Sequence, residues 1–125
     1  MLDRFSVYAV LPSQDLDRAR AWYRDHLGME PETEDPGGLW YRCAGDTWFV
    51  VTRSAFAGTA QNTAAGFHVE HIEEAMSDLR DRGVVFEEYD LPDFKTVDGL
   101  FTFGGSKAAW FKDCDGNIIE VAEVG

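Results

Sequence analysis

The sequence predicts an α+β fold in which two tandem βαβββ modules form a cupped mixed β-sheet with the helices outside. The order strand, helix, strands can be read twice along the 125 residues, and equivalent positions of the two halves repeat at fixed offsets. Ala19 and Ala75, in the two predicted helices, lie 56 residues apart, and Trp40 and Trp110, in the two predicted hairpins, lie 70 residues apart. The repeat predicts one domain over residues 1–125, with pseudo-repeats of about 1–56 and 57–125.

The chain begins with a predicted strand over residues 5–10. Alternation gives this strand a face turned toward the helix and a face turned away from it, which carry Phe5, Val7 and Ala9 and then Ser6, Tyr8 and Val10. Pro12 and Ser13 are expected to end the strand.

A helix and a hairpin complete the first half. Asp15 is a good N-cap residue, apolar side chains recur at helical spacing from Leu16 to Leu27, and Gly28 supplies the residue that ends a helix. The runs LWYRCA and TWFVVTR then flank Gly45-Asp46 and predict a β-hairpin. The sequence leaves the hairpin register open.

The second half repeats this order with an insertion. AAGFHV predicts a strand, apolar spacing from Ile72 to Leu79 predicts a helix that Gly83 ends, VVFEE predicts a further strand, and Asp115-Gly116 predicts a hairpin turn. Extra residues fall in the stretch 88–105, where an insertion in one repeat usually marks the binding side. Its segment GLFTFGG is read either as a flexible lid hinged at glycines or as an exposed loop.

The net negative charge of the chain limits which classes of partner are expected. Eleven Lys and Arg residues against 23 Asp and Glu residues give a formal net charge of −12, which repels phosphate backbones and anionic lipid headgroups. We therefore expect no nucleic-acid or membrane partner. The same field attracts a cationic ligand, although a merely solubilising acidic surface explains it as well.

The two cysteines and the amino-terminal residues suggest a cytoplasmic protein. The first ten residues contain no uninterrupted apolar stretch of the kind found in a secretion signal, and no run of apolar residues is long enough to span a membrane. Cys43 and Cys114 lack the CxxC spacing, so free thiols are expected in place of a disulfide.

Three segments in this order resemble the glyoxalase / bleomycin-resistance / extradiol-dioxygenase superfamily, also called vicinal oxygen chelate proteins. The segments are DLDRARAWYRDHLGMEPE, HIEEAMSDLRDRGVVFEE and AAWFKDCDGNIIEVAE, and the resemblance covers nearly the whole chain. It implies a sheet cup that holds a small molecule, and a homodimer, as is common among short two-module members.

The resemblance also implies four positions for a divalent metal in the cup, which correspond here to Tyr8, Val50, Ala64 and Glu120. Only Glu120 carries a side chain that binds such an ion. We therefore expect no metal cofactor, while a divalent ion held through a non-standard ligand set stays open.

The candidate ligand-binding residues are those assigned to the cup, together with Phe101 in the insertion and Trp110, whose face depends on the hairpin register. They are Tyr8, Trp48, Val50, His68, Phe101, Trp110 and Glu120. Tyr8 and the tryptophans suit a planar ligand, although ordinary packing is an equal alternative for Tyr8. Glu120 and His68 are the acid–base candidates, and for each a structural role at the sheet rim is the alternative.

The leading functional hypothesis is a metal-free binding protein, of sequestration or antibiotic-resistance type, that holds an aromatic or cationic compound in the cup. The alternative is a lyase, isomerase or dioxygenase-like enzyme of the same superfamily that uses Glu120 or His68, or a non-standard metal site. A purely structural interaction module has no positive feature in its favour.

Overall fold

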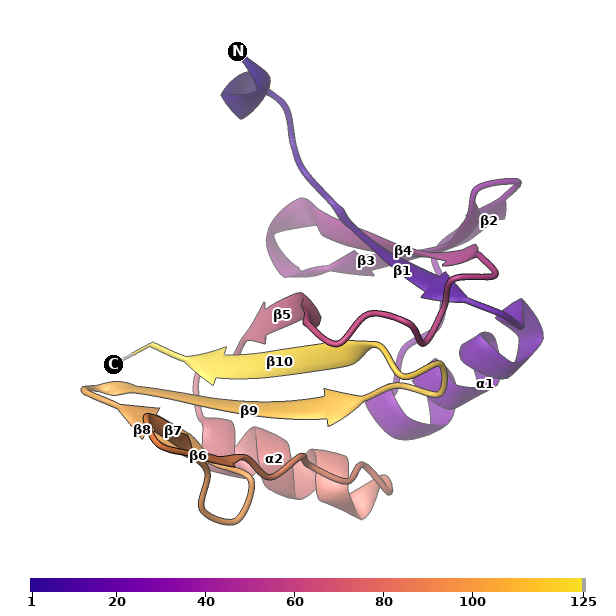
Figure 1. The fold of residues 1–125 in the computed structure, drawn as a ribbon. Helices are drawn as coiled ribbons and strands as arrows, with labels where there is room; N and C mark the ends of the chain where they lie inside the picture. Colours follow the sequence, from indigo (N-terminus) through magenta and orange to yellow (C-terminus); the bar gives the residue numbers. More distant parts are fainter. Residues whose placement is uncertain (125) are drawn as a thin grey trace.

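The computed structural model describes residues 1–124. The chain folds into two four-stranded β-sheets, each with one helix packed on it (Figure 1). Across the first sheet the strands are β1 (Ala9–Ser13), β4 (Thr47–Arg53), β3 (Gly38–Cys43) and β2 (Thr33–Asp35). Strand β1 runs parallel to β4, and the other pairs are antiparallel. The helix α1 (Leu16–Leu27) packs on this sheet, and short 3-10 helices occupy Leu2–Arg4 and Ala44–Asp46.

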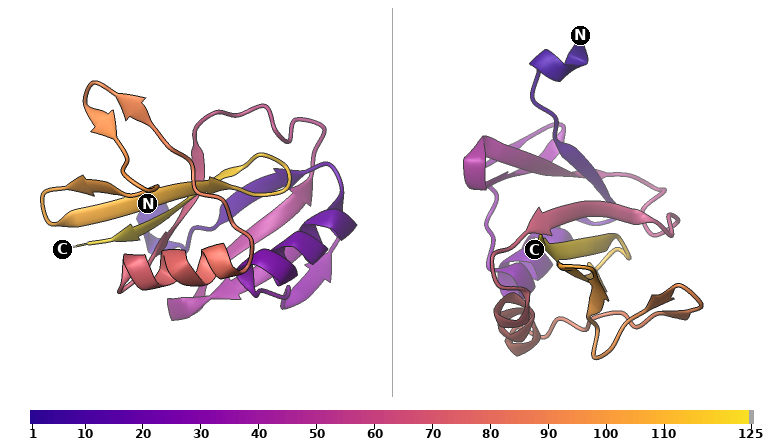
Figure 2. Two further views of the ribbon diagram at one scale, coloured as in Figure 1. Left: turned by 90° about the horizontal axis from the view of Figure 1, so that it is seen from below. Right: turned by 90° about the vertical axis from the view of Figure 1, so that its left-hand side faces the viewer.

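The second sheet repeats this arrangement. Its strands are β5 (Thr63–His68), β10 (Ile118–Glu123), β9 (Ser106–Lys112) and β8 (Phe101–Phe103), and the helix α2 (Ile72–Asp81) packs on it. A small hairpin of β6 (Asp90–Leu91) and β7 (Phe94–Lys95) lies on the side of this sheet away from α2 (Figure 2). The predicted α+β fold of two βαβββ modules is confirmed.

Equivalent rows of residues cross the middle of the two sheets. The register partners are Val10–Val50–Trp40 in the first sheet and Gly66–Glu120–Trp110 in the second. The offsets of 56 and 70 residues that relate the halves of the sequence thus relate these rows as well. Glu120 occupies the place in the second sheet that Val50 occupies in the first.

The helices begin and end where the sequence predicts. The Asp15 carboxylate accepts a hydrogen bond from the Arg18 backbone N–H at 3.1 Å, and Gly28 ends α1 in the left-handed conformation with φ of 66°. At the start of α2 the Ile72 N–H donates to the Glu123 carboxylate at 2.9 Å, while His71 makes no side-chain cap. No helix within residues 1–124 is long and apolar enough to cross a membrane.

The first strand begins four residues later than predicted, at Ala9, and ends at Ser13. The segment before Ala9 is an arm that leaves the sheet, in which Phe5 and Val7 are 60% and 87% exposed (Figure 1). The strand continues through Pro12 because β1 is an edge strand of its sheet, where a missing N–H interrupts no central ladder. The predicted alternation of Ala9 and Val10 still holds, since Ala9 packs on the core and Val10 is 52% exposed.

Two expectations in the second half are also wrong. The segment VVFEE is not a strand and forms only one bridge, between Phe86 and Phe111. The segment GLFTFGG, expected as a lid or an exposed loop, instead contains strand β8, which pairs with β9, although Phe103 is exposed as a loop residue would be. Gly104, with φ of 57°, turns the chain tightly between these two strands.

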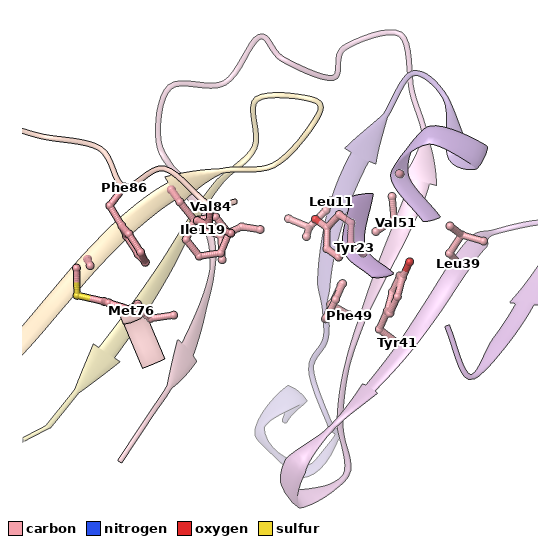
Figure 3. Packing of buried hydrophobic residues seen from close by; sticks show 14 of the residues in the cluster. Leu11, Tyr23, Leu39, Tyr41, Phe49, Val51, Met76, Val84, Phe86 and Ile119 are labelled. Atoms are coloured by element: carbon pink, nitrogen blue, oxygen red, sulfur yellow. The ribbon is translucent and has the colours of Figure 1, made fainter. Parts of the chain in front are cut away.

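One hydrophobic core joins the helix-facing sides of the two sheets. Figure 3 shows Tyr23, Tyr41 and Phe49 on one side of this core and Met76 and Phe86 on the other. The modules meet through ring contacts such as that between Phe49 and Phe67, whose centroids lie 5.9 Å apart.

Both helices therefore lie within the angle between the sheets, and the opposite face of each sheet points outward (Figures 1 and 2). The expected single cup with the helices outside is not formed by residues 1–124 of one chain, because β1 and β5 do not pair and the strands make two separate sheets. We call these the helix-free faces. The helix-free face of the first sheet carries Trp40, Trp48 and Val50, and that of the second sheet carries Trp110, Glu120 and His68.

Candidate functional site

An aromatic pocket lies on the helix-free face of the first sheet. It has a volume of about 280 Å³ and is bordered by Tyr8, Trp40 and Trp48, with Asp35 and Asp46 at its edge. The Tyr8 and Trp40 rings meet edge to face, with centroids 4.9 Å apart. The Trp40 indole N–H donates to the Asp35 carboxylate at 3.1 Å, which fixes the indole against the pocket.

Trp48 is held by a neighbouring cation. The Arg42 guanidinium lies 5.8 Å from the centre of the Trp48 ring and forms an ion pair with Asp46. Val50 is only 3% exposed and does not border the pocket, so it belongs to the packed part of this face.

A second pocket lies on the helix-free face of the second sheet. Its volume is about 310 Å³, and it is bordered by Glu120 together with the rings of Trp110, Tyr89 and Phe94. Trp110 is the register partner of Glu120, which brings the indole and the carboxylate together. Phe101 stacks on Phe94 with centroids 4.6 Å apart, behind the aromatic wall and not on the pocket itself.

His68 borders neither of these two pockets. It is exposed, and its register partner on β10 is Ala122, one row beyond Glu120 on the same face. No hydrogen bond joins His68 to Glu120 among the described residues. An acid–base pair of these two side chains is therefore not formed here.

The candidate residues predicted from the sequence divide between the two faces. The first pocket receives Tyr8 and Trp48, and the second receives Trp110 and Glu120. Because the two faces point in different directions, one chain does not bring these residues into one pocket.

Sequence reasoning missed Tyr89 and left the face of Trp40 open. Tyr89 lies at the start of the insertion, and the signal for its position is the turn at Pro92-Asp93 between β6 and β7, which folds Phe94 back beside it. The ring centroids of Tyr89 and Phe94 are 5.2 Å apart.

The residues at the implied metal positions do not fit a divalent ion. Val50 is a buried aliphatic side chain, Ala64 carries only a methyl group, and the carboxylate of Glu120 is the one strong ligand of the set. Within residues 1–124 no group of three His, Cys, Asp or Glu side chains converges to hold a metal.

The two thiols are not activated. Burial, reinforced by Asp113 and Asp115, raises the pKa of Cys114 to about 12, and burial also raises the pKa of Cys43. Neither thiol is a nucleophile near neutral pH, because the reactive form is the thiolate. Both cysteines are free, as expected.

A family model described as glyoxalase/bleomycin resistance protein/dioxygenase superfamily matches residues 5–121. The comparison with curated protein sequences gives no match.

Solved structures share the fold at low sequence identity. A glyoxalase / bleomycin resistance protein from Catenulispora acidiphila DSM 44928 is 23% identical with a TM-score of 0.68, covering 97% of this chain and 99% of its own. Lactoylglutathione lyase from Agrobacterium tumefaciens is 21% identical with a TM-score of 0.66, covering 95% and 92%. The fosfomycin resistance protein FosX from Listeria monocytogenes is 15% identical with a TM-score of 0.67, covering 97% and 93%.

Proposed function

The chain belongs to the glyoxalase/bleomycin resistance protein/dioxygenase superfamily, and we propose that it is a binding protein that sequesters a small aromatic compound without a metal and without turnover. The observation that carries the proposal is the pocket where Tyr8, Trp40 and Trp48 border one cavity of about 280 Å³. Large flat side chains of this kind give apolar area and stacking to a planar ligand.

The absence of a fitting ligand set supports binding over metal-dependent chemistry. The family's reactions depend on a chelated metal, as the resemblance implies, and here the equivalent positions offer one carboxylate, Glu120. The other acid–base candidate, His68, lies outside the pocket that Glu120 borders.

We propose further that a second copy of the chain completes the site, so that the protein is a homodimer. Each chain leaves two aromatic pockets on outward-pointing faces and extends an arm whose exposed apolar residues are Met1, Leu2, Phe5 and Val7. Such residues are costly to leave in water and suit contact with a second copy. A first pocket placed against the second pocket of the partner encloses a ligand on two sides.

A thermal-shift screen of planar aromatic and organic cationic compounds on EDTA-treated protein tests the proposal. We expect one or more compounds to raise the melting temperature in a saturable way, since a ligand that binds only the folded state stabilises it. Consumption of any such compound by the protein at substrate excess supports the enzyme alternative instead. A screen without a hit contradicts the proposed function.

A further inference from the structure

The second pocket pairs one carboxylate with an aromatic wall. It occupies about 310 Å³ on the helix-free face of the second sheet, and the residues that border it include Asn62 and Thr63 besides Tyr89, Phe94, Trp110 and Glu120. This volume lies at the small end of the range for small-molecule pockets, roughly 300–1,000 Å³.

The Glu120 carboxylate is held at this pocket without a partner. It makes no ion pair or side-chain hydrogen bond with any residue among 1–124. Its neighbour on β5 is Gly66, where a Cβ atom would lie 3.3 Å from the Glu120 Oε2 atom, so a larger residue there would crowd the carboxylate. The nearest cation on β9, Lys112, is already paired with Glu87 at 3.2 Å.

The aromatic wall beside the carboxylate is closely packed. The Trp110 ring lies 5.1 Å from that of Phe94 and 5.8 Å from that of Tyr89, measured between centroids. A hydrogen-bonded clamp anchors the insertion that carries Tyr89 and Phe94. The buried Thr96 hydroxyl donates to Glu88 at 2.6 Å and accepts from the Tyr89 N–H at 2.8 Å.

These features favour one class of ligand group. A hydrated inorganic cation such as Mg²⁺ or Zn²⁺ requires several oxygen or nitrogen ligands, and one carboxylate does not supply them. An anion is repelled by Glu120. An alkylated ammonium group is weakly hydrated and gains from a carboxylate and from aromatic rings together.

From this juxtaposition we infer that the second pocket is a subsite for an organic ammonium group, such as a trimethylammonium. The inference rests on the proposed function, because it names the chemical class of one part of the ligand. A compound with a planar aromatic part and an alkylammonium part would place these parts in the two kinds of pocket.

Choline and its neutral carbon isostere, 3,3-dimethylbutan-1-ol, have the same shape but differ in charge, so comparing their affinities tests whether the pocket binds a positive charge. In a calorimetric or ligand-observed NMR titration we expect choline to bind at least about tenfold more tightly than the alcohol, an interval that corresponds to about 1.4 kcal/mol. Raising the salt concentration should weaken choline binding and leave the alcohol unchanged. Equal binding of the two compounds, or no binding of choline, overturns the inference.

Substitutions at Glu120 and Phe94 show whether these residues are responsible for choline binding. Glu120→Gln should weaken choline binding about tenfold and remove its preference over the alcohol, and Phe94→Leu should weaken it about threefold by removing a ring. Glu74→Gln makes the same charge change on the exposed side of α2 and should leave the affinity within twofold. Melting temperatures of all variants identify any that fail to fold. An unchanged affinity in a folded Glu120→Gln variant contradicts the inference.

The outcome is separable from that of the proposed function. If neutral aromatic compounds bind in the screen while choline shows no advantage over the alcohol, the ammonium subsite is wrong and the binding function stands. If no compound of either kind binds, the proposed function itself is wrong.

Discussion

The Tyr23 hydroxyl donates a hydrogen bond of 2.6 Å to the Asp113 carboxylate, 90 positions further along the chain. Both residues are buried, and the bond joins α1 of the first module to the turn between β9 and β10 of the second. The Asp113 carboxylate also accepts from the backbone N–H groups of Asp115 and Asn117 and from the Asn117 side chain. The bond thus links the two modules beside the hydrophobic core that they share.

We predict that Tyr23→Phe lowers the free energy of unfolding by about 1–2 kcal/mol, because it removes a buried hydrogen bond to a carboxylate. Tyr41→Phe is the matched control. Its ring lies 5.4 Å from that of Tyr23 and is equally buried, but its hydroxyl has no hydrogen-bond partner among the described residues. Removal of that hydroxyl should be neutral or stabilising. Urea denaturation of the two variants measures the difference, and equal losses would refute the role given to Asp113.

Alkaline pH should destabilise the protein. Burial raises the pKa of Cys114 and that of Tyr41 to about 12 each, so both groups keep their protons in the folded state. In the unfolded chain they ionise near about 8.5 and 10. The folded state then binds more protons, and its stability falls as the pH rises from about 8.5 toward 12. Denaturation at several pH values measures this fall. In Cys114→Ser the loss of stability that begins below pH 10 should be smaller. An unchanged dependence of the free energy of unfolding on pH would count against the buried thiol as its cause.

Trp48→Ala should weaken binding of the tightest aromatic compound from the screen by roughly 2 kcal/mol or more if the indole is a buried anchor. Tyr8→Ala should weaken it less, because Tyr8 is 51% exposed at the pocket edge. Isothermal titration of the two variants gives both affinities. If the compound binds with unchanged affinity to both variants, the first pocket is not its site.

Val7→Asp should dissociate the homodimer without unfolding the chain. Val7 is 87% exposed on the amino-terminal arm, so a charge there costs the monomer little, whereas it opposes an apolar contact with a second copy. Light scattering should give twice the 14.0 kDa chain mass for the parent protein and the single mass for the variant. Val97→Asp, at a valine 67% exposed in the insertion, is the control and should remain dimeric. A monomeric parent protein would show that the chain does not form the proposed homodimer.

The fold was predictable because both halves of the sequence show the same order of strand, helix and strands. Hydrophobic spacing and end residues such as Asp15 and Gly28 define α1 locally, and the structure confirms them. The first strand was displaced because alternation in residues 5–10 is a local pattern, while pairing with β4 depends on distant residues. The strand β8 in the insertion was not predicted for the same reason, because it forms by pairing with β9.

The candidate site was predictable only in part. Strand parity correctly grouped Trp48 with Val50, but it does not reveal burial, and Val50 is covered. The faces of Trp40 and Trp110 required the hairpin registers, and the meeting of Tyr89 with Trp110 required the path of the insertion. The direction in which each helix-free face points follows from how the two modules share one hydrophobic core, which no local pattern in the sequence encodes.

A tryptophan-fluorescence titration shows whether ligand binding is independent of a divalent metal. Protein stripped with EDTA is titrated with the tightest compound from the screen, before and after addition of one equivalent of Zn²⁺, Ni²⁺ or Mn²⁺. We expect saturable quenching with the same dissociation constant, within twofold, in every case. Binding that appears only after a divalent ion is restored, or a stoichiometric divalent ion in the protein as purified, would contradict it.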